Sequence, residues 1–306
     1  MASVTLAESA KLSQNMLVAG VIESVITVNP FFELLPFQGI EGNALAYNRE
    51  NALGDVMSAG IGDTITAKAA ATFTPITSSL TTLIGDAEVN GLIQATRSNF
   101  TSQKAVQIAS KAKSIGRKYQ DQMINGAGSG ADMTGLLSLL PGAQIIATAT
   151  NGSNLSFALL DELLDTVKDK DGQVDFIQMP ARTIRAYYAL LRALGGATMN
   201  EAATLPSGKV VPAYRGVPIF RNDWIPVNQT QAGSGAVCTT VLAGTIDDGS
   251  MTHGIAGLTA MDEAGIRIQE VGVMEAKDES ITRVKWYCGL ALFSDKGLAG
   301  ITGVLN

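Results

Sequence analysis

Cysteine, histidine and charged residues are scarce in this chain of 306 residues. With 2 Cys and 1 His, it cannot build a metal site from several of these ligands. Cys238 and Cys288 lie far apart in apolar strand patterns, which predicts inert free thiols in a reducing compartment. Only 16% of the residues are charged, against ~25% in ordinary domains. We interpret this as a chain that gives much of its exterior to neighbouring subunits, although a Gly- and Ala-rich enzyme would have a similar composition.

Long apolar runs and an excess of basic residues are also absent. The longest uncharged stretches, 133–160 and 224–246, are interrupted by Pro, Gly and Asn, so neither offers the ~20 mainly apolar residues of a membrane helix. The N-terminus lacks a basic start followed by an apolar block, so no secretory signal is predicted. A balance of 22 Lys+Arg against 28 Asp+Glu argues against a dedicated nucleic-acid binder. We expect a soluble protein with no membrane partner.

The residues present do not form a recognisable catalytic set. His253 is the single candidate base for a triad, and the G-x-S-x-G elbow that would supply a serine is missing. The glycine-rich run 126–130 follows a predicted helix, whereas a dinucleotide loop follows a strand. The Asp-rich turn before Gly172 places Val167 and Gln178 where a calcium loop needs carboxylates. We therefore predict no enzyme activity, no cofactor and no metal site.

The first third of the chain contains segments that cannot bury their apolar residues alone. Residues 3–27 form a loosely amphipathic arm, and the apolar run 31–37 that follows is expected to lie on another surface. From 42 to 96 the period shifts to two, which predicts a long β-hairpin. Its strand-like pieces are 44–49, 64–68, 72–77 and 80–84. A two-stranded ribbon is marginal in isolation, so we expect the hairpin to lie against a partner.

Residues 99–125 form the strongest helical segment of the chain. Apolar residues recur there at three- and four-residue steps, and ~26 residues would extend for roughly 40 Å. Lys104, Lys111 and Lys118 recur at seven-residue steps, so one flank is basic. The simpler interpretation is a solvated helix face. The functional alternative is a loose, sequence-independent attraction for a polyanion, without the interleaved aromatics that base stacking needs.

The remainder alternates between helices and strands. Ser156 caps one amphipathic helix and Pro180 begins another, with a short apolar strand at 174–179 between them. Extended pieces at 210–227 and 237–242 complete a compact α/β lobe. The segments 265–275 and 281–293 are expected to form a long antiparallel pair.

The order of these elements carries more information than any single motif. An arm, a long hairpin, one long helix, an α/β lobe and a closing β-pair follow one another. Leu-Leu-Pro-Phe at 34–37 leads to Tyr-Asn-Arg-Glu at 47–50, and Arg283 precedes the stretch 286–289 in the closing strand. This order and these residues resemble the major capsid protein of tailed bacteriophages, which implies the α+β fold of the Hong Kong 97 type.

The resemblance implies a division of the chain into five parts. These are an N-terminal arm over 1–38, an extended β-loop with the leading strands of the peripheral domain over 39–95, a spine helix and connecting loop of that domain over 96–134, an axial domain over 135–257, and closing strands of the peripheral domain over 258–306. The expected subunit contacts are Phe31, Phe32, Leu34, Leu35, Phe37, Arg49, Glu50 and Lys68. The expected interior basic face consists of Lys104, Lys111 and Lys118, because the family's spine helices lie on the inner side of the shell.

The function implied is a major capsid protein that self-assembles into an icosahedral shell around packaged double-stranded DNA. It would be found in the virion after assembly in the bacterial cytoplasm. Its expected partners are its own copies in pentamers and hexamers, a separate scaffolding protein, a portal, a decoration protein and loosely contacted DNA. Two alternatives remain: an encapsulin-like compartment that encloses an enzyme cargo, and a cytoplasmic α/β enzyme with a Gly-rich phosphate loop.

Overall fold

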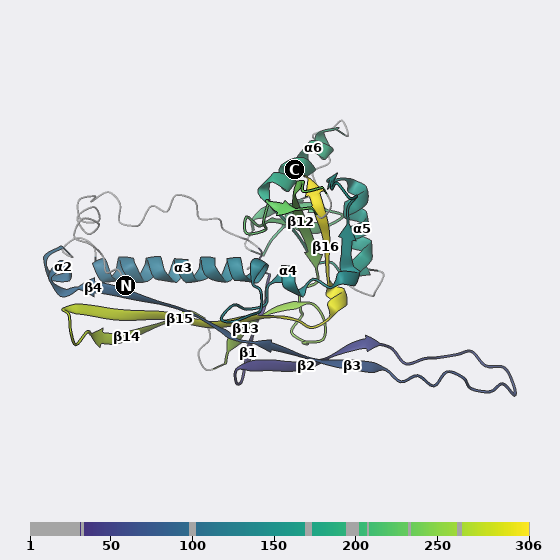
Figure 1. The fold of residues 1–306 in the computed structure, drawn as a ribbon, viewed down its shortest axis with the longest axis horizontal. Helices are drawn as coiled ribbons and strands as arrows, with labels where there is room; N and C mark the ends of the chain where they lie inside the picture. Colours follow the sequence, from purple (N-terminus) through teal and green to yellow (C-terminus); the bar gives the residue numbers. More distant parts are fainter. Residues whose placement is uncertain are drawn as a thin grey trace.

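The structure is a computed structural model that describes residues 31, 34–97, 102–168, 173–193, 202–206, 208–231, 234–261 and 265–305. Figure 1 shows three parts: a long helix on a five-stranded sheet, an α/β lobe above one end of that sheet, and a hairpin that projects past the lobe. The predicted arm up to residue 30 and the candidate contact Phe32 lie outside the described residues.

The five-stranded sheet is built around its longest strand, β15. Its members are β1 (Phe37–Ile40), β4 (Thr81–Asn90), β13 (Ile255–Ala260), β14 (Arg267–Val273) and β15 (Glu279–Leu292). β4 pairs antiparallel with one edge of β15, while β13 and β14 follow one another along the other edge. β1 adds to β13 in parallel. The predicted closing pair is thereby confirmed as β14 and β15.

The predicted long helix is α3 (Gln103–Asn125), which packs on β4 and β15 (Figure 1). The Ser102 side chain caps its first turn, and Gly126 follows its last residue, with an N–H that donates to the last turn. Ile115 and Tyr119 are buried on the side that faces the sheet. The helical period read from the sequence is therefore confirmed, with a start four residues later than predicted.

The α/β lobe contains a nine-stranded sheet. Its strands are β5 (Ile145–Ala147), β6 (Ser153–Asn154), β7 (Phe176–Met179), β8 (Ala202–Thr204), β9 (Val210–Tyr214), β10 (Val217–Arg221), β11 (Gln229–Thr230), β12 (Val237–Gly244) and β16 (Leu298–Leu305). Helix α5 (Phe157–Lys168) begins after Ser156 as predicted, and α6 (Ala181–Ala193) begins one residue later than the predicted start at Pro180. The remaining short elements are α2 (Gly91–Arg97), α4 (Leu136–Leu139), η2 (Gly142–Gln144) and η3 (Asp295–Gly297).

The last strand corrects the predicted division of the chain. β16 pairs antiparallel with β12 in the middle of the lobe sheet, so the segment 258–306 is not a single set of closing strands of the peripheral domain. Ala299, Ile301 and Val304 are fully buried in the lobe core, which explains why the chain returns there. The predicted boundary at 257 also falls inside β13, which belongs wholly to the five-stranded sheet.

The hairpin consists of β2 (Ala44–Ala52) and β3 (Thr72–Ser79), paired along most of their length. The predicted strand at 64–68 is not formed, because residues 53–71 have no ladder partner among the described residues. The hairpin is therefore a regular ribbon at its base and an irregular, extended tip.

Candidate assembly surfaces

The base of the hairpin is fastened to its own chain. The Tyr47 hydroxyl donates a hydrogen bond to the Leu292 carbonyl at 2.8 Å, and Arg49 Nη2 donates to the same oxygen at 2.6 Å. The Tyr47 ring meets the Phe293 ring edge-on at a centroid distance of 5.1 Å. Leu45 packs on the same small core under β1 and β13. The direction in which the hairpin projects is thus set by the subunit itself.

The tip of the hairpin, which we define as residues 53–71, has the opposite character. Its large apolar side chains are exposed to solvent, with Leu53 at 78% and Val56 at 88% of full exposure. Ile61 and Ile65 are also exposed, as is Phe73 in the adjoining part of β3. Few backbone groups in the tip are paired within the described chain. Several large apolar side chains exposed within one segment are typical of an interaction surface.

The three predicted hairpin contacts differ in what they do. Arg49 is half-buried and donates hydrogen bonds to the Leu292 and Phe293 carbonyls, so its guanidinium holds the hairpin base in its own subunit. Its contact with a neighbouring copy stays a prediction. Glu50 and Lys68 are exposed, and their contact with another copy stays a prediction.

The expected subunit contacts between residues 31 and 37 differ in how deeply they are buried. Phe31 is fully buried, with its ring 4.7 Å from that of Phe176, and Leu35 lies in the same core. The prediction that these two side chains contact a neighbour is therefore wrong: they join the lobe to the five-stranded sheet within one subunit. Leu34 is half-buried against this core. Phe37 remains 41% exposed, although its ring also contacts the subunit's own aromatic residues.

The three lysines of the predicted basic face lie along the flank of α3 nearest the sheet. Lys104 forms an ion pair with Glu270 of β14 and holds the pKa of that carboxyl below its usual range. Lys118 forms an ion pair with Asp121 one turn further along the helix, at 3.5 Å. Lys111 makes no ion pair within the described part of the chain. Two of the three charges are therefore balanced internally, which weakens the attraction expected for a polyanion.

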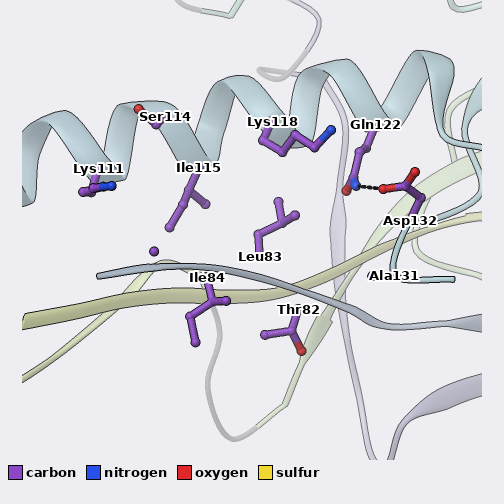
Figure 2. Close-up of a pocket in the computed structure, with 11 residues that line it drawn as sticks. Thr82, Leu83, Ile84, Lys111, Ser114, Ile115, Lys118, Gln122, Ala131 and Asp132 are labelled. Atoms are coloured by element: carbon purple, nitrogen blue, oxygen red, sulfur yellow. Dashed lines mark hydrogen bonds between the residues drawn. The ribbon is translucent and has the colours of Figure 1, made fainter. Parts of the chain in front are cut away.

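A groove of about 420 Å³ separates α3 from β4 (Figure 2). Ile115 from the helix and Leu83 from the strand point toward one another and form its apolar floor. Lys111 and Lys118 stand on the helix side, roughly 10 Å apart because seven helical residues separate them. The groove therefore combines an apolar floor with two cations.

A buried amide closes one end of this groove. Gln122 is only 4% exposed, and its Nε2 donates a hydrogen bond to the Asp132 carboxylate at 2.5 Å (Figure 2). Its Oε1 has no hydrogen-bond partner among the residues that the structure describes. A buried carbonyl oxygen without a donor carries a desolvation cost.

Other chemistry is sparse in the described chain. Both cysteines are free and buried as predicted, and burial raises the pKa of the Cys288 thiol to about 12. His253 Nδ1 lies 3.0 Å from the Thr252 hydroxyl in an exposed loop. Among the described residues, no three His, Cys, Asp or Glu side chains are grouped so as to hold a metal ion. None of the described helices has the length and apolarity needed to cross a membrane.

The sequence did not reveal the groove, because a groove depends on which strand a helix covers. The alternation in β4 was a partial signal, since Leu83, Ala87 and Val89 are all buried at two-residue or four-residue steps. Nothing in the sequence identified α3 as the element above them.

Solved structures share this fold over nearly the whole chain. The holo-SrpI encapsulin complex from Synechococcus elongatus PCC 7942 has a TM-score of 0.72 and 20% identity, and the match covers 99% of this chain and 96% of that one. The capsid of the native GTA particle has a TM-score of 0.65 and 13% identity, and the match covers 100% of both chains. The structure of Microbacterium phage Oxtober96 has a TM-score of 0.62 and 14% identity, and the match covers 98% of this chain and 99% of that one. The predicted α+β fold of the Hong Kong 97 type is confirmed.

Sequence comparison identifies a narrower group. No curated protein sequence matches the chain. A family profile described as type 2A encapsulin shell protein, SrpI-like, matches residues 101–304, which is more than half of the chain and includes α3, the lobe and β13 to β15. The chain therefore belongs to the SrpI-like family of type 2A encapsulin shell proteins.

Proposed function

We propose that this chain is the shell protein of an encapsulin-type compartment, in which many copies close around protein cargo. Family membership supports a shell-forming role and argues against the α/β enzyme alternative. The observation that carries the proposal is the hairpin: its base is clamped to the subunit while its tip exposes several large apolar residues. The described part of the subunit leaves the tip uncovered, and contact with another copy would bury it.

Burial is the driving force that we propose for assembly. Removing apolar surface from water gives ~25 cal/mol per Å², and each large aliphatic side chain of the tip contributes roughly 1.5–3 kcal/mol when fully covered. Part of this is lost to the ordering that association requires. Each contact between two copies is therefore weak. In a closed shell many such contacts form at once, and their free energies add. Pentamers, with hexamers in larger shells, are the expected capsomers.

A tailed-bacteriophage capsid is the second candidate, and it is supported by the likeness to phage structures along almost the full chain. On that alternative the scaffolding protein, portal, decoration protein and packaged DNA would be partners, and the virion would be the location. The ion pairs of Lys104 and Lys118 favour the compartment, because they leave less positive charge for DNA.

Expression of the chain alone in a bacterial host separates the two candidates. Negative-stain microscopy should show closed shells that contain no nuclease-protected DNA, and a gene for a cargo enzyme should lie beside the shell gene. Shells that form only with a co-expressed scaffolding protein, next to portal and terminase genes, would favour the phage capsid. Failure to form any shell under either condition contradicts both.

A further inference from the structure

One end of the groove between α3 and β4 carries a cation that the subunit does not neutralise. Lys111 lines this end and makes no ion pair within the part of the chain that the structure describes. It helps to lower the pKa of Asp86, but both oxygens of that carboxylate accept hydrogen bonds from Arg283. The Lys111 ammonium can therefore bind a carboxylate that enters the groove.

The opposite end of the groove is acidic. Asp132 lies there and accepts a hydrogen bond from the Gln122 amide (Figure 2). The Lys118 side chain extends toward the same end, but its ammonium is paired with Asp121 at 3.5 Å. Two carboxylates thus accompany one ammonium, so a second anionic group is unfavourable at this end.

The stretch between the two ends is apolar, elongated and open. Leu83 and Ile115 form its floor, and the eleven helical residues from Lys111 to Gln122 span roughly 16 Å. A Cβ atom placed on Gly85 would lie 3.6 Å from Lys111 Cδ, an ordinary contact distance, so the strand leaves room beside the lysine. The volume of about 420 Å³ falls within the roughly 300–1,000 Å³ that is typical of small-molecule sites.

These features specify a slender ligand with a negative charge at one end only. We propose that the groove binds one molecule of a single-chain fatty acid, with its carboxylate on Lys111 and its alkyl chain over Ile115 and Leu83 toward Asp132. A chain of this kind covers the apolar floor and places no charge beside the acidic end. The site goes beyond the proposed function, since neither a compartment nor a capsid requires it.

Calorimetry with decanoate below its micellar concentration tests the site on the full chain. One molecule should bind per chain, and Lys111→Gln should weaken the affinity at least tenfold. The matched control Lys168→Gln removes an exposed lysine of α5 and should leave the affinity unchanged. Gly85→Val, which occupies the space beside Lys111 with a residue that strands favour, should also weaken binding. Unchanged affinity in Lys111→Gln, or an equal loss in Lys168→Gln, would overturn the proposal.

Ligands of equal chain length test the polarity of the groove without any substitution. Decanol lacks the carboxylate, and sebacate adds a second one that would lie beside Asp132 and Asp121. Both should bind at least tenfold more weakly than decanoate. Equal binding of sebacate would contradict the proposal, and so would uptake of several decanoate molecules per chain, which is adsorption of a detergent. These results do not depend on whether the chain forms shells, so the proposed function and this inference can fail separately.

Tryptophan fluorescence tests where the ligand lies. Leu83 of the groove floor pairs with Trp286 across the sheet, and the chain has only one other tryptophan, Trp224. In a Trp224→Phe background, a fatty acid brominated on its alkyl chain should quench Trp286, and decanoate should reverse the quenching. Binding of the brominated acid without quenching would place it elsewhere and overturn the proposal.

Discussion

The lobe and the hairpin tip contain similar aliphatic residues in opposite environments. In α5 the side chains of Leu160, Leu163 and Leu164 are completely buried between the helix and the lobe sheet. In the tip, Leu53 and Val56 are almost completely exposed. Hydrophobic stabilisation depends on the apolar area that is buried. The aliphatic side chains of the lobe therefore stabilise the folded subunit, whereas those of the tip contribute only when association buries them. Subunit stability and assembly can therefore be changed separately in this chain.

Removing the tip should have the largest effect, because it should abolish assembly and leave the stability of the subunit unchanged. The Asp55 N–H donates to the Ala69 carbonyl at 3.0 Å, so the two arms are close enough there to be joined by a short turn. Replacing residues 56–68 with Asn-Gly should abolish shells and leave the melting temperature of the subunit within about 2 °C of a wild-type chain kept unassembled. Microscopy and scanning calorimetry check the two halves of this expectation. Shells of normal size from the shortened chain would show that the tip has no part in assembly.

Two aliphatic truncations, one in the lobe core and one in the tip, should affect subunit stability very differently. Leu164→Ala should lower the free energy of unfolding by about 2–5 kcal/mol, because it leaves a cavity in a closed core. Ile65→Ala in the exposed tip should change it by less than about 0.5 kcal/mol. Urea denaturation should be measured on unassembled protein, where no shell contacts contribute. When the same amount of folded protein is compared, Ile65→Ala should lower the yield of shells more than Leu164→Ala does. Equal losses of unfolding free energy in the two variants would contradict the separate control of stability and assembly.

The parts of the fold that the sequence predicted are those governed by local periodicity. The stripe that includes Ile115 and Tyr119 predicted α3, and the caps before α5 and α6 marked their starts within one residue. Such signals depend on contacts between residues a few positions apart. Glycine at 126 likewise predicted where the long helix stops.

The parts that the sequence missed depend on pairing between distant segments. β16 follows β15 directly in the chain, yet it pairs with β12 in another sheet, and no local pattern distinguishes the two destinations. Phe31 was expected on a neighbour because its run is too apolar for water, but apolarity does not reveal whose core receives a side chain. The groove was missed for the same reason, since it exists only once α3 lies on β4.

Loosening the hairpin base should have a moderate, local effect. Tyr47→Phe removes the hydroxyl that donates to the Leu292 carbonyl, at a cost of about 0.5–1.5 kcal/mol. Hydrogen exchange should accelerate in β2 and β3 and remain unchanged in the lobe. Tyr188→Phe is the matched control, because the Tyr188 hydroxyl makes no hydrogen bond with the described residues. Faster exchange throughout the chain would mean that the base is part of the global fold rather than a separate clamp.

The smallest expected effect concerns the sheet that joins the two regions. Arg283 of β15 donates two hydrogen bonds to the Asp86 carboxylate of β4, at 2.8 and 2.9 Å, and this pairing holds the pKa of Asp86 below its usual range. An acid with a lowered folded pKa stabilises the fold above its unfolded pKa of ~3.9, and that contribution is lost as the pH falls through the folded value. The wild-type chain should therefore exceed Asp86→Asn in unfolding free energy at pH 6, and the difference should shrink toward pH 2. Urea denaturation across this range checks it, with Asp165→Asn, an exposed carboxylate on α5, as the control. A difference that stays constant with pH would mean that the two side chains contribute through packing and not through charge.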